Sequence, residues 1–167
     1  MREIRLLGLE TIPIVEEGDD IGALICEAAE REGVGLRDGD VVVVSHIIVS
    51  RAEGRVVDLS DVEPSEFAKN VAEALGKDPR LVEMVLRESK SIARMGDGHL
   101  ICETKHGFIC ANAGVDRSNV PGENRVALLP EDPDASARRI RERIRQLTGR
   151  DVAVIISDTH GRPLRRG

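Results

Sequence analysis

The sequence predicts one α+β domain, a mixed α/β fold with a mixed sheet and flanking helices. Its 167 residues fall within the ~100–200 residues of a typical domain. Apolar residues make up 41% and charged residues 32%, a balance typical of globular proteins. β-branched runs alternate with segments of helical periodicity, and no repeat or Pro/Ser-rich linker divides the chain. We therefore expect a single hydrophobic core and one domain over residues 1–167.

The N-terminal third predicts a strand, a helix and a second strand. Residues 3–9 are expected to form a short strand, followed by an irregular segment. After the cap candidates Asp19 and Asp20, apolar residues recur at helical spacing, at Ile21, Leu24, Ile25, Ala28 and Ala29. A turn at residues 37–40 leads into the β-branched run of residues 41–49, which has the pattern of a buried central strand.

The middle of the chain predicts two helices and a hairpin. Both helices lie between residues 64 and 89, and the second is expected to begin with Asp78 as its cap. Pro79 then occupies the first helical position, where its missing N–H costs nothing. Short strands are expected around residues 100–103 and 107–110, joined by a turn. These patterns do not fix the order of the strands.

The last part of the chain predicts a basic helix and a strand. Asp134 is the expected cap of a helix with one apolar face, and Gly149 is expected to end it. Five arginines lie on the remainder of this helix, between Arg138 and Arg145. Residues 152–157 then have the pattern of another buried strand.

Charge and aromatic content argue against nucleic acid or a membrane surface as partner. The net charge is −6, distributed as −9 over residues 1–65, −3 over residues 66–137 and +6 over residues 138–167. The acidic residues 1–65 disfavour binding to polyanions. The sequence has only two aromatic residues that could stack on bases, Phe67 and Phe108. The basic end either serves a phosphorylated ligand or neutralises the acidic half.

Neither a membrane span nor a cysteine framework is indicated. No apolar run approaches the ~20 residues of a membrane span. The N-terminus lacks the apolar core of a signal peptide, so the expected location is the cytoplasm. Cys26, Cys102 and Cys110 are odd in number and form no C-x-x-C, so neither a disulfide framework nor a zinc knuckle is predicted.

Three segments are richer in polar residues than folding requires. In residues 111–120, Asp116, Ser118 and Asn119 can direct a carboxylate and an amide at one ligand. The alternative for this segment is an Asx-turn that only links two elements.

The second segment, residues 157–167, follows an apolar strand. Asp158 and Thr159 suit a hard cation such as Mg²⁺ or Mn²⁺ bound together with phosphate oxygens. Three arginines follow, and their planar guanidinium groups suit phosphate or carboxylate. The alternative is a strand end with a solvated basic tail. In the third segment, residues 45–55, Arg51 is either a phosphate contact or a surface ion-pair partner.

Several motifs occur in order along the chain. Near the N-terminus stand Glu10-Thr11-Ile12-Pro13, Glu17-Gly18-Asp19-Asp20 and Val49-Ser50-Arg51-Ala52-Glu53-Gly54-Arg55. They are followed by His106-Gly107-Phe108-Ile109-Cys110-Ala111-Asn112-Ala113-Gly114-Val115-Asp116 and Ser118-Asn119-Val120. Leu128-Leu129-Pro130-Glu131-Asp132-Pro133-Asp134 and Asp158-Thr159-His160-Gly161-Arg162-Pro163 complete the series. Together they resemble the coenzyme F-420:L-glutamate ligase (gamma-glutamyl ligase) family over essentially the whole chain, and residues 107–120 are the most specific part.

The resemblance implies a GTP-dependent ligase of archaea and some bacteria. Its substrates would be GTP, L-glutamate and the deazaflavin precursor of coenzyme F-420. The first glutamate would be joined to the lactyl carboxylate and later ones through gamma linkages, by way of an acyl phosphate with release of GDP and phosphate. The resemblance also implies Mg²⁺ or Mn²⁺, expected as two ions, a requirement for K⁺, and an intertwined homodimer.

The resemblance also assigns site residues, position by position. The residues that match metal ligands are Asp116, Asp158 and Thr159. The residues that match nucleotide contacts are Glu10, Thr11, Ile12, Pro13, His46, Ile47, Arg51 and Asn119. No residue is assigned as catalytic. His46 and Ile47 stand where two polar residues are usual, and Arg51 stands where Lys is common, so the contact at Ile47 would have to come from the backbone.

Two other functions stay open from the sequence alone. In the family the chain continues past the position of Gly167, with a further metal-binding glutamate and a Gly-rich stretch near the phosphates. On that basis either the chain is a fragment or those parts come from elsewhere, and a truncated, catalytically incomplete nucleotide-binding or dimerisation module is one alternative. A related ligase with a folate-like acceptor is the other, since the residues do not identify the acceptor ring.

Overall fold

The computed structural model describes residues 3–158, which fold as five α-helices, two 3-10 turns and seven strands within that range. The helices are α1 (Ile21–Arg31), α2 (His46–Ala52), α3 (Glu66–Leu75), α4 (Pro79–Arg87) and α5 (Pro133–Thr148). The strands are β1 (Val41–Ser45), β2 (Val56–Asp58), β3 (Ser89–Gly96), β4 (His99–Thr104), β5 (Ile109–Ala111), β6 (Arg125–Ala127) and β7 (Ala153–Ser157). The 3-10 turns are η1 (Leu59–Asp61) and η2 (Asn112–Gly114). The predicted α+β class is confirmed.

The chain forms two compact units, where the sequence predicted a single core. Unit 1 consists of the described residues up to Gly54 together with Pro130–Ser157, and unit 2 consists of Arg55–Leu129 with Asp158. Each unit has its own cluster of buried apolar side chains, around Val49 and Ile144 in unit 1 and around Leu59 and Val82 in unit 2. The chain leaves unit 1 and later returns to it, which local sequence patterns do not reveal.

The strands lie in three small sheets within the described residues, and the predicted mixed sheet does not form there. In unit 1, β1 and β7 pair in parallel, with Val41 opposite Ala153 and Ser45 opposite Ser157. In unit 2, β2 pairs with β6 and β3–β4–β5 form a meander, all antiparallel. Parallel and antiparallel pairing both occur, but in different units.

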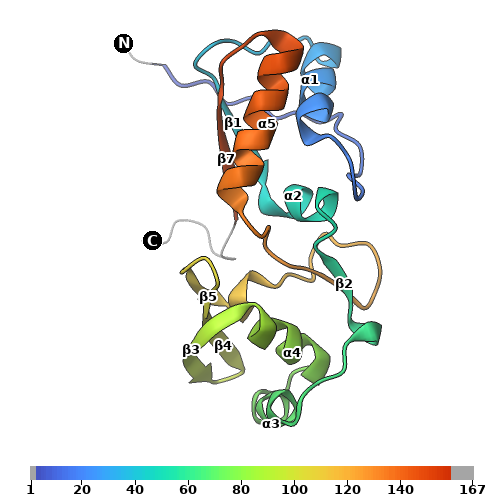
Figure 1. The fold of residues 1–167 in the computed structure, drawn as a ribbon, viewed down its shortest axis with the longest axis vertical. Helices are drawn as coiled ribbons and strands as arrows, with labels where there is room; N and C mark the ends of the chain where they lie inside the picture. The colour runs from blue at the N-terminus through green and yellow to red at the C-terminus, as the bar shows by residue number, and fades with distance from the viewer. Residues whose placement is uncertain (1–2, 159–167) are drawn as a thin grey trace. The chain divides into compact units, whose positions relative to one another are not determined.

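Unit 1 is built on the packing of α1 against α5, which lie side by side next to β1 and β7 (Figure 1). Gly22 is required at this crossing, since a Cβ there would lie 2.7 Å from Cβ of Arg143. The predicted Asp20 cap of α1 is confirmed, because its Oδ1 accepts from the Ala23 amide at 3.0 Å. In α5 the cap is Asp132 rather than Asp134, because Pro133 takes the first helical position.

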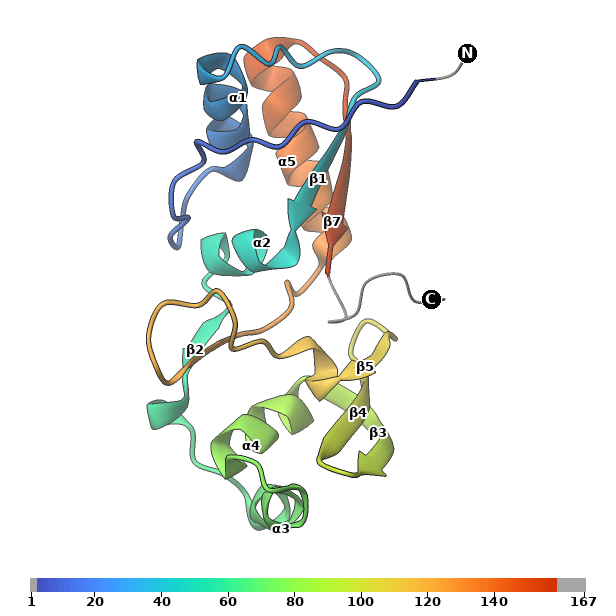
Figure 2. The same cartoon turned by 180° about the vertical axis from the view of Figure 1, so that it is seen from behind.

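Two strand predictions in unit 1 are wrong. The run of residues 41–49 is a strand only as far as Ser45 and continues as α2, in which His46, Val49 and Ser50 form a buried face. Residues 3–9 form no strand; they run as chain without regular structure across unit 1 (Figure 2). Ile4 and Leu6 are 89% and 90% exposed there, and the segment pairs with no strand of the described chain.

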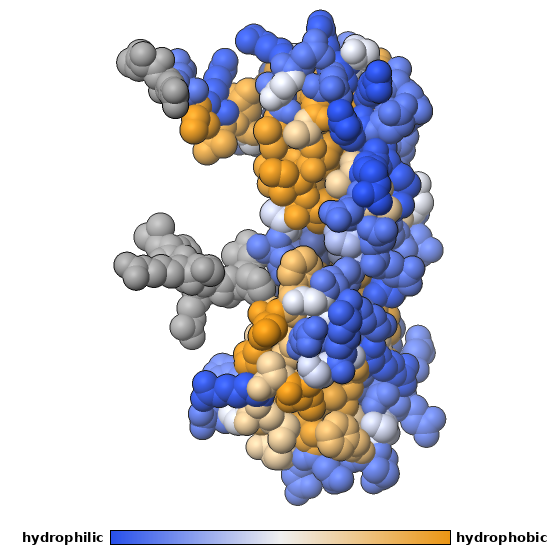
Figure 3. Space-filling model, turned by 60° about the vertical axis from the view of Figure 1, so that its left-hand side comes forward, coloured by the Kyte–Doolittle hydropathy of each residue, from blue (hydrophilic) through white to orange (hydrophobic). Residues whose placement is uncertain are grey.

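The β1–β7 pair buries one face and exposes the other. Val41, Val43 and Ile155 are all more than half exposed, and apolar side chains gather over this part of unit 1 (Figure 3). The prediction that these strands are buried on both faces is therefore wrong for residues 3–158 of the single chain. In that same range, no helix has the length and apolar character needed to cross a membrane.

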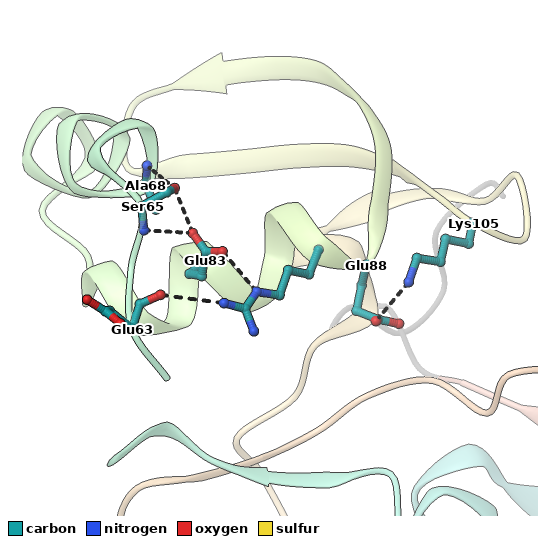
Figure 4. Close-up of polar contacts among 7 residues, drawn as sticks. Glu63, Ser65, Ala68, Glu83, Glu88 and Lys105 are labelled. Carbon is teal, nitrogen blue, oxygen red and sulfur yellow. Dashed lines mark hydrogen bonds and ion pairs between the residues drawn. The ribbon is translucent and has the colours of Figure 1, made fainter. Parts of the chain in front are cut away.

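Unit 2 confirms the predicted helices and hairpin. Asp78 caps α4 and Pro79 is its first residue, while β4 and β5 are joined by a turn at residues 105–108. Two carboxylates fasten α4 to its surroundings (Figure 4). Glu83 accepts from the backbone and side chain of Ser65, the cap of α3, and Glu88 accepts from Arg55 and from Lys105.

Candidate functional site

The loop after β5 is the most strained part of the described chain. Asn112, Ala113 and Asn119 all have positive φ, although they are not glycines. Between them, Gly114 has φ +73°, and a Cβ there would lie 2.7 Å from Cδ1 of Leu129. Four residues of this loop therefore have left-handed backbone conformations within eight positions.

Asp116 is fixed within this loop by neutral donors. Its backbone bridges to Ala127, with N–H···O distances of 2.9 and 2.7 Å. Its carboxylate accepts from the Ser118 amide at 2.7 Å and from the Ser118 hydroxyl at 2.6 Å. The Asx-turn that the sequence offered as an alternative is therefore present. Within the described residues Asp116 forms no ion pair, so its charge is held in place but not neutralised.

Asp158 follows β7 and groups with unit 2. Burial raises the pKa of the Cys110 thiol, and the negative charge of Asp158 raises it further. Cys110 lies on β5, six residues before Asp116. Thr159, the third predicted metal ligand, lies outside the described residues.

The described part of the chain contains no cluster of three or more His, Cys, Asp or Glu residues placed to hold a metal ion. Of the three predicted metal ligands, two lie in that part, the carboxylates of Asp116 and Asp158, which are hard oxygen donors. Carboxylates suit Mg²⁺ or Mn²⁺, which bind through one or two of them and take their other ligands from water and phosphate.

The nucleotide-contact prediction at residues 10–13 falls on an irregular segment of unit 1. Oε1 of Glu32 accepts from the backbone amides of Glu10 and Thr11, both at 2.8 Å. Ile12 packs against the unit 1 core, the same core against which α2 packs. The segment is therefore fixed by a carboxylate on one side and an apolar contact on the other.

His46, Ile47 and Arg51 all lie on α2. His46 is buried at the first position of this helix, whereas Ile47 and Arg51 are partly exposed, with Arg51 in the last turn. The structure thus places these three residues and residues 10–13 in unit 1, around one core. Asn119, Asp116 and Asp158 belong to unit 2.

Other residues of the N-terminal motifs hold unit 1 together. The Gly18 amide donates to the Ala52 carbonyl at 2.9 Å, so the two motifs contact each other directly. Near them, a cavity of about 330 Å³ is lined by the start of α1, the end of α2 and one side of α5. Arg143 donates to Asp20 at 2.5 Å and Arg139 donates to Glu53, so each arginine in the cavity wall faces a carboxylate.

Burial opposes ionisation of Asp20, yet the Ala23 amide and Arg143 together hold the pKa of its carboxyl below the usual range. The cavity wall therefore carries paired, compensated charges. Sequence reasoning gave no role to Glu32, Glu53 or Arg139, because the contacts from Glu32 to Thr11 and from Glu53 to Arg139 join residues more than 20 positions apart.

Comparison with known proteins assigns the family. The family model described as F420-0:Gamma-glutamyl ligase matches residues 10–167. Proteins named Coenzyme F420:L-glutamate ligase are 52% identical in Methanopyrus kandleri, 49% in Methanothermobacter thermautotrophicus and 42% in Methanocaldococcus jannaschii. These matches cover 96%, 98% and 99% of this chain and 63%, 65% and 64% of the respective relatives. The chain belongs to the F420-0:gamma-glutamyl ligase family, and it spans just under two thirds of the length of these relatives.

Proposed function

We propose that the protein is a GTP-dependent ligase that joins L-glutamate to the coenzyme F-420 precursor. Family membership supports the ligase class, and the names of the relatives support the pair of substrates. The observation that carries the proposal in the structure is Asp116, a carboxylate held by Ser118 in a strained loop without a cationic partner among the described residues. Such a group is suited to a cation that bridges to phosphate.

The proposed reaction has two steps, since a carboxylate oxygen is not a leaving group when an amine attacks. The acceptor carboxylate first attacks the γ-phosphorus of GTP, the bond to the β–γ bridging oxygen breaks, and GDP leaves. The amine of glutamate then attacks the acyl carbon, the bond to the phosphate oxygen breaks, and the amine loses a proton. The product is an amide, with GDP and phosphate released.

In this proposal Asp116 and Asp158 hold Mg²⁺ or Mn²⁺, and two ions are expected. When bound, the metal supplies charge neutralisation at the phosphates. The nucleotide contacts of the proposal are residues 10–13, His46, Ile47, Arg51 and Asn119. Arg51 supplies positive charge, and residues 10–13 offer backbone groups to the nucleotide. The K⁺ requirement and the cytoplasmic location remain predictions.

The test is an assay with purified protein, GTP, L-glutamate, the deazaflavin precursor and Mn²⁺. We expect one GDP for each amide formed, measured by mass spectrometry and nucleotide chromatography. Asp116→Asn and Asp158→Asn each remove a charge while keeping shape, so activity should fall about 100-fold or more with an unchanged circular dichroism spectrum. Asp61→Asn is the control, because Asp61 is exposed in η1 and should leave activity unchanged. Amide formation without GTP, or normal turnover of both variants, would contradict the proposal.

We also propose that the protein is a homodimer. The support is the apolar outer face of β1 and β7, since parallel strands are normally covered on both faces and a two-fold partner is a common cover. Light scattering at micromolar concentration should report twice the chain mass. A monodisperse species of 18.2 kDa would refute it.

A further inference from the structure

The segment formed by residues 10–13 has no helix or strand, and a single carboxylate oxygen accepts three hydrogen bonds from it. Oε1 of Glu32 accepts three hydrogen bonds, from the Glu10 amide at 2.8 Å, the Thr11 amide at 2.8 Å and the Thr11 hydroxyl at 2.7 Å. Nη1 of Arg31 donates to the Thr11 carbonyl at 3.1 Å. Both the donor and the acceptor of the Thr11 backbone are therefore bound to two consecutive residues about 20 positions downstream.

Glu32 is itself fixed to a rigid element. It is the C-terminal cap of α1, and its own amide donates to the Ala28 carbonyl at 3.0 Å. The helix it ends is buried along Ile25, Ala28 and Ala29 in the core of unit 1. The carboxylate can therefore hold residues 10–13 in a fixed position relative to the helix, although these residues form no helix or strand hydrogen bonds of their own.

We infer that Glu32 is a positioning residue, which holds residues 10–13 in the conformation that binds GTP. The inference rests on the proposed function, because it concerns the segment assigned there to the nucleotide. A segment that is already ordered loses little freedom when the ligand binds, whereas a released segment must be ordered at that moment. Glu32 contacts the segment rather than the reacting atoms, so its removal should weaken GTP binding and leave the chemical step intact.

The chain offers a matched set of variants. Glu32→Ala removes all three acceptor contacts, and Glu32→Gln keeps an oxygen at the same place but loses the charge that strengthens them. Glu30→Ala is the control, since Glu30 is exposed on the same helix and its side chain forms no hydrogen bond within the described residues. It changes the net charge by the same amount as Glu32→Ala.

Two measurements test the inference, calorimetric binding of GTP with Mn²⁺ and hydrogen exchange of the Glu10 and Thr11 amides. For Glu32→Ala we expect a rise of about tenfold in Kd and in KM for GTP, with kcat within about twofold of wild type. The two amides should lose protection in this variant. Glu32→Gln should give a Kd for GTP and an amide protection between those of wild type and Glu32→Ala. Glu30→Ala should match wild type in both measurements.

The outcomes separate the inference from the proposed function. If the wild type binds GTP and Glu32→Ala binds it equally well, the inference is overturned while the proposed function stands. Equal weakening by Glu30→Ala would overturn it too, because the effect would then be one of net charge. If the wild type binds no GTP, the proposed function fails and the inference fails with it.

Discussion

Glu83 is the carboxylate whose contribution to stability the structure defines most sharply. It accepts from the Ser65 amide at 3.0 Å, from the Ser65 hydroxyl at 2.7 Å and from Nε of Arg87 at 2.8 Å (Figure 4). Ser65 in turn caps α3, because its hydroxyl accepts from the Ala68 amide at 3.2 Å. The Ser65 amide and hydroxyl, followed by Arg87, lower the pKa of Glu83 from 4.5 to about 2.

The sign and size of the effect of pH on stability follow from the difference between the lowered pKa of Glu83 and its usual value. A carboxyl whose pKa is lower in the folded state stabilises the fold above pH 4.5 and loses that contribution as the pH falls towards 2. A difference of one pKa unit corresponds to about 1.4 kcal/mol, so the upper limit of the contribution of Glu83 to the free energy of unfolding is about 3 kcal/mol. The site lies near the surface, with the Arg87 side chain 52% exposed, so solvent screening reduces the expected contribution to about 2 kcal/mol. Less than half of it should remain at pH 3.

The assay is urea unfolding of wild type, Glu83→Gln and Glu73→Gln at pH 6 and pH 3. Glu73 is exposed on α3 and its side chain forms no hydrogen bond among the residues that the structure describes, so Glu73→Gln should unfold like wild type. We expect Glu83→Gln to be less stable than wild type by about 2 kcal/mol at pH 6 and by about 1 kcal/mol or less at pH 3. A difference between the two proteins that is the same at both pH values would refute the reasoning.

Two further predictions concern ligand and loop. GTP with Mn²⁺ at 100 times Kd should stabilise the protein by about 2.7 kcal/mol in a thermal shift assay, and GTP alone should give far less, since Asp116 and Asp158 repel bare phosphates. Equal stabilisation with and without Mn²⁺ would count against the metal assignment. Gly114→Ala should lower the free energy of unfolding by about 2–3 kcal/mol more than Gly107→Ala, measured in urea. Both positions have positive φ, but only at Gly114 does a Cβ meet another atom within 4 Å, so similar losses would disprove the close-packing argument.

Four of the five helices in the described chain, all except α2, could be predicted from the sequence because their signals are local. Asp20, Asp78 and Gly149 each act on a backbone group within a few residues, and all three cap the helices that they were expected to cap. The single error of this kind is the start of α5, where Asp132 and Asp134 are both plausible caps and Pro133 between them decides.

The strands could not be predicted equally well because their partners are distant. Val41 pairs with Ala153 across more than 100 residues, and nothing near Val41 indicates that its outer face stays uncovered in the single chain. Residues 3–9 were expected to form a strand but pair with none among the described residues, whereas residues 46–49 have strand composition and form a helix. In each case a tertiary contact, or the lack of one, overrides local propensity.

The candidate site separates into motif residues that stabilise the fold and motif residues that remain available for chemistry. Asp20 and Glu53 have arginine partners on α5, so their charges are neutralised within unit 1 and their motifs are explained by architecture. Asp116 has the opposite arrangement, because Ser118 donates two neutral hydrogen bonds that orient the carboxylate and leave its charge intact. A sequence motif gives these three carboxylates equal weight. In the structure they differ in whether the charge already has a cationic partner in the described chain. Because Asp116 has none there, we assign the proposed metal and phosphate chemistry to the loop after β5.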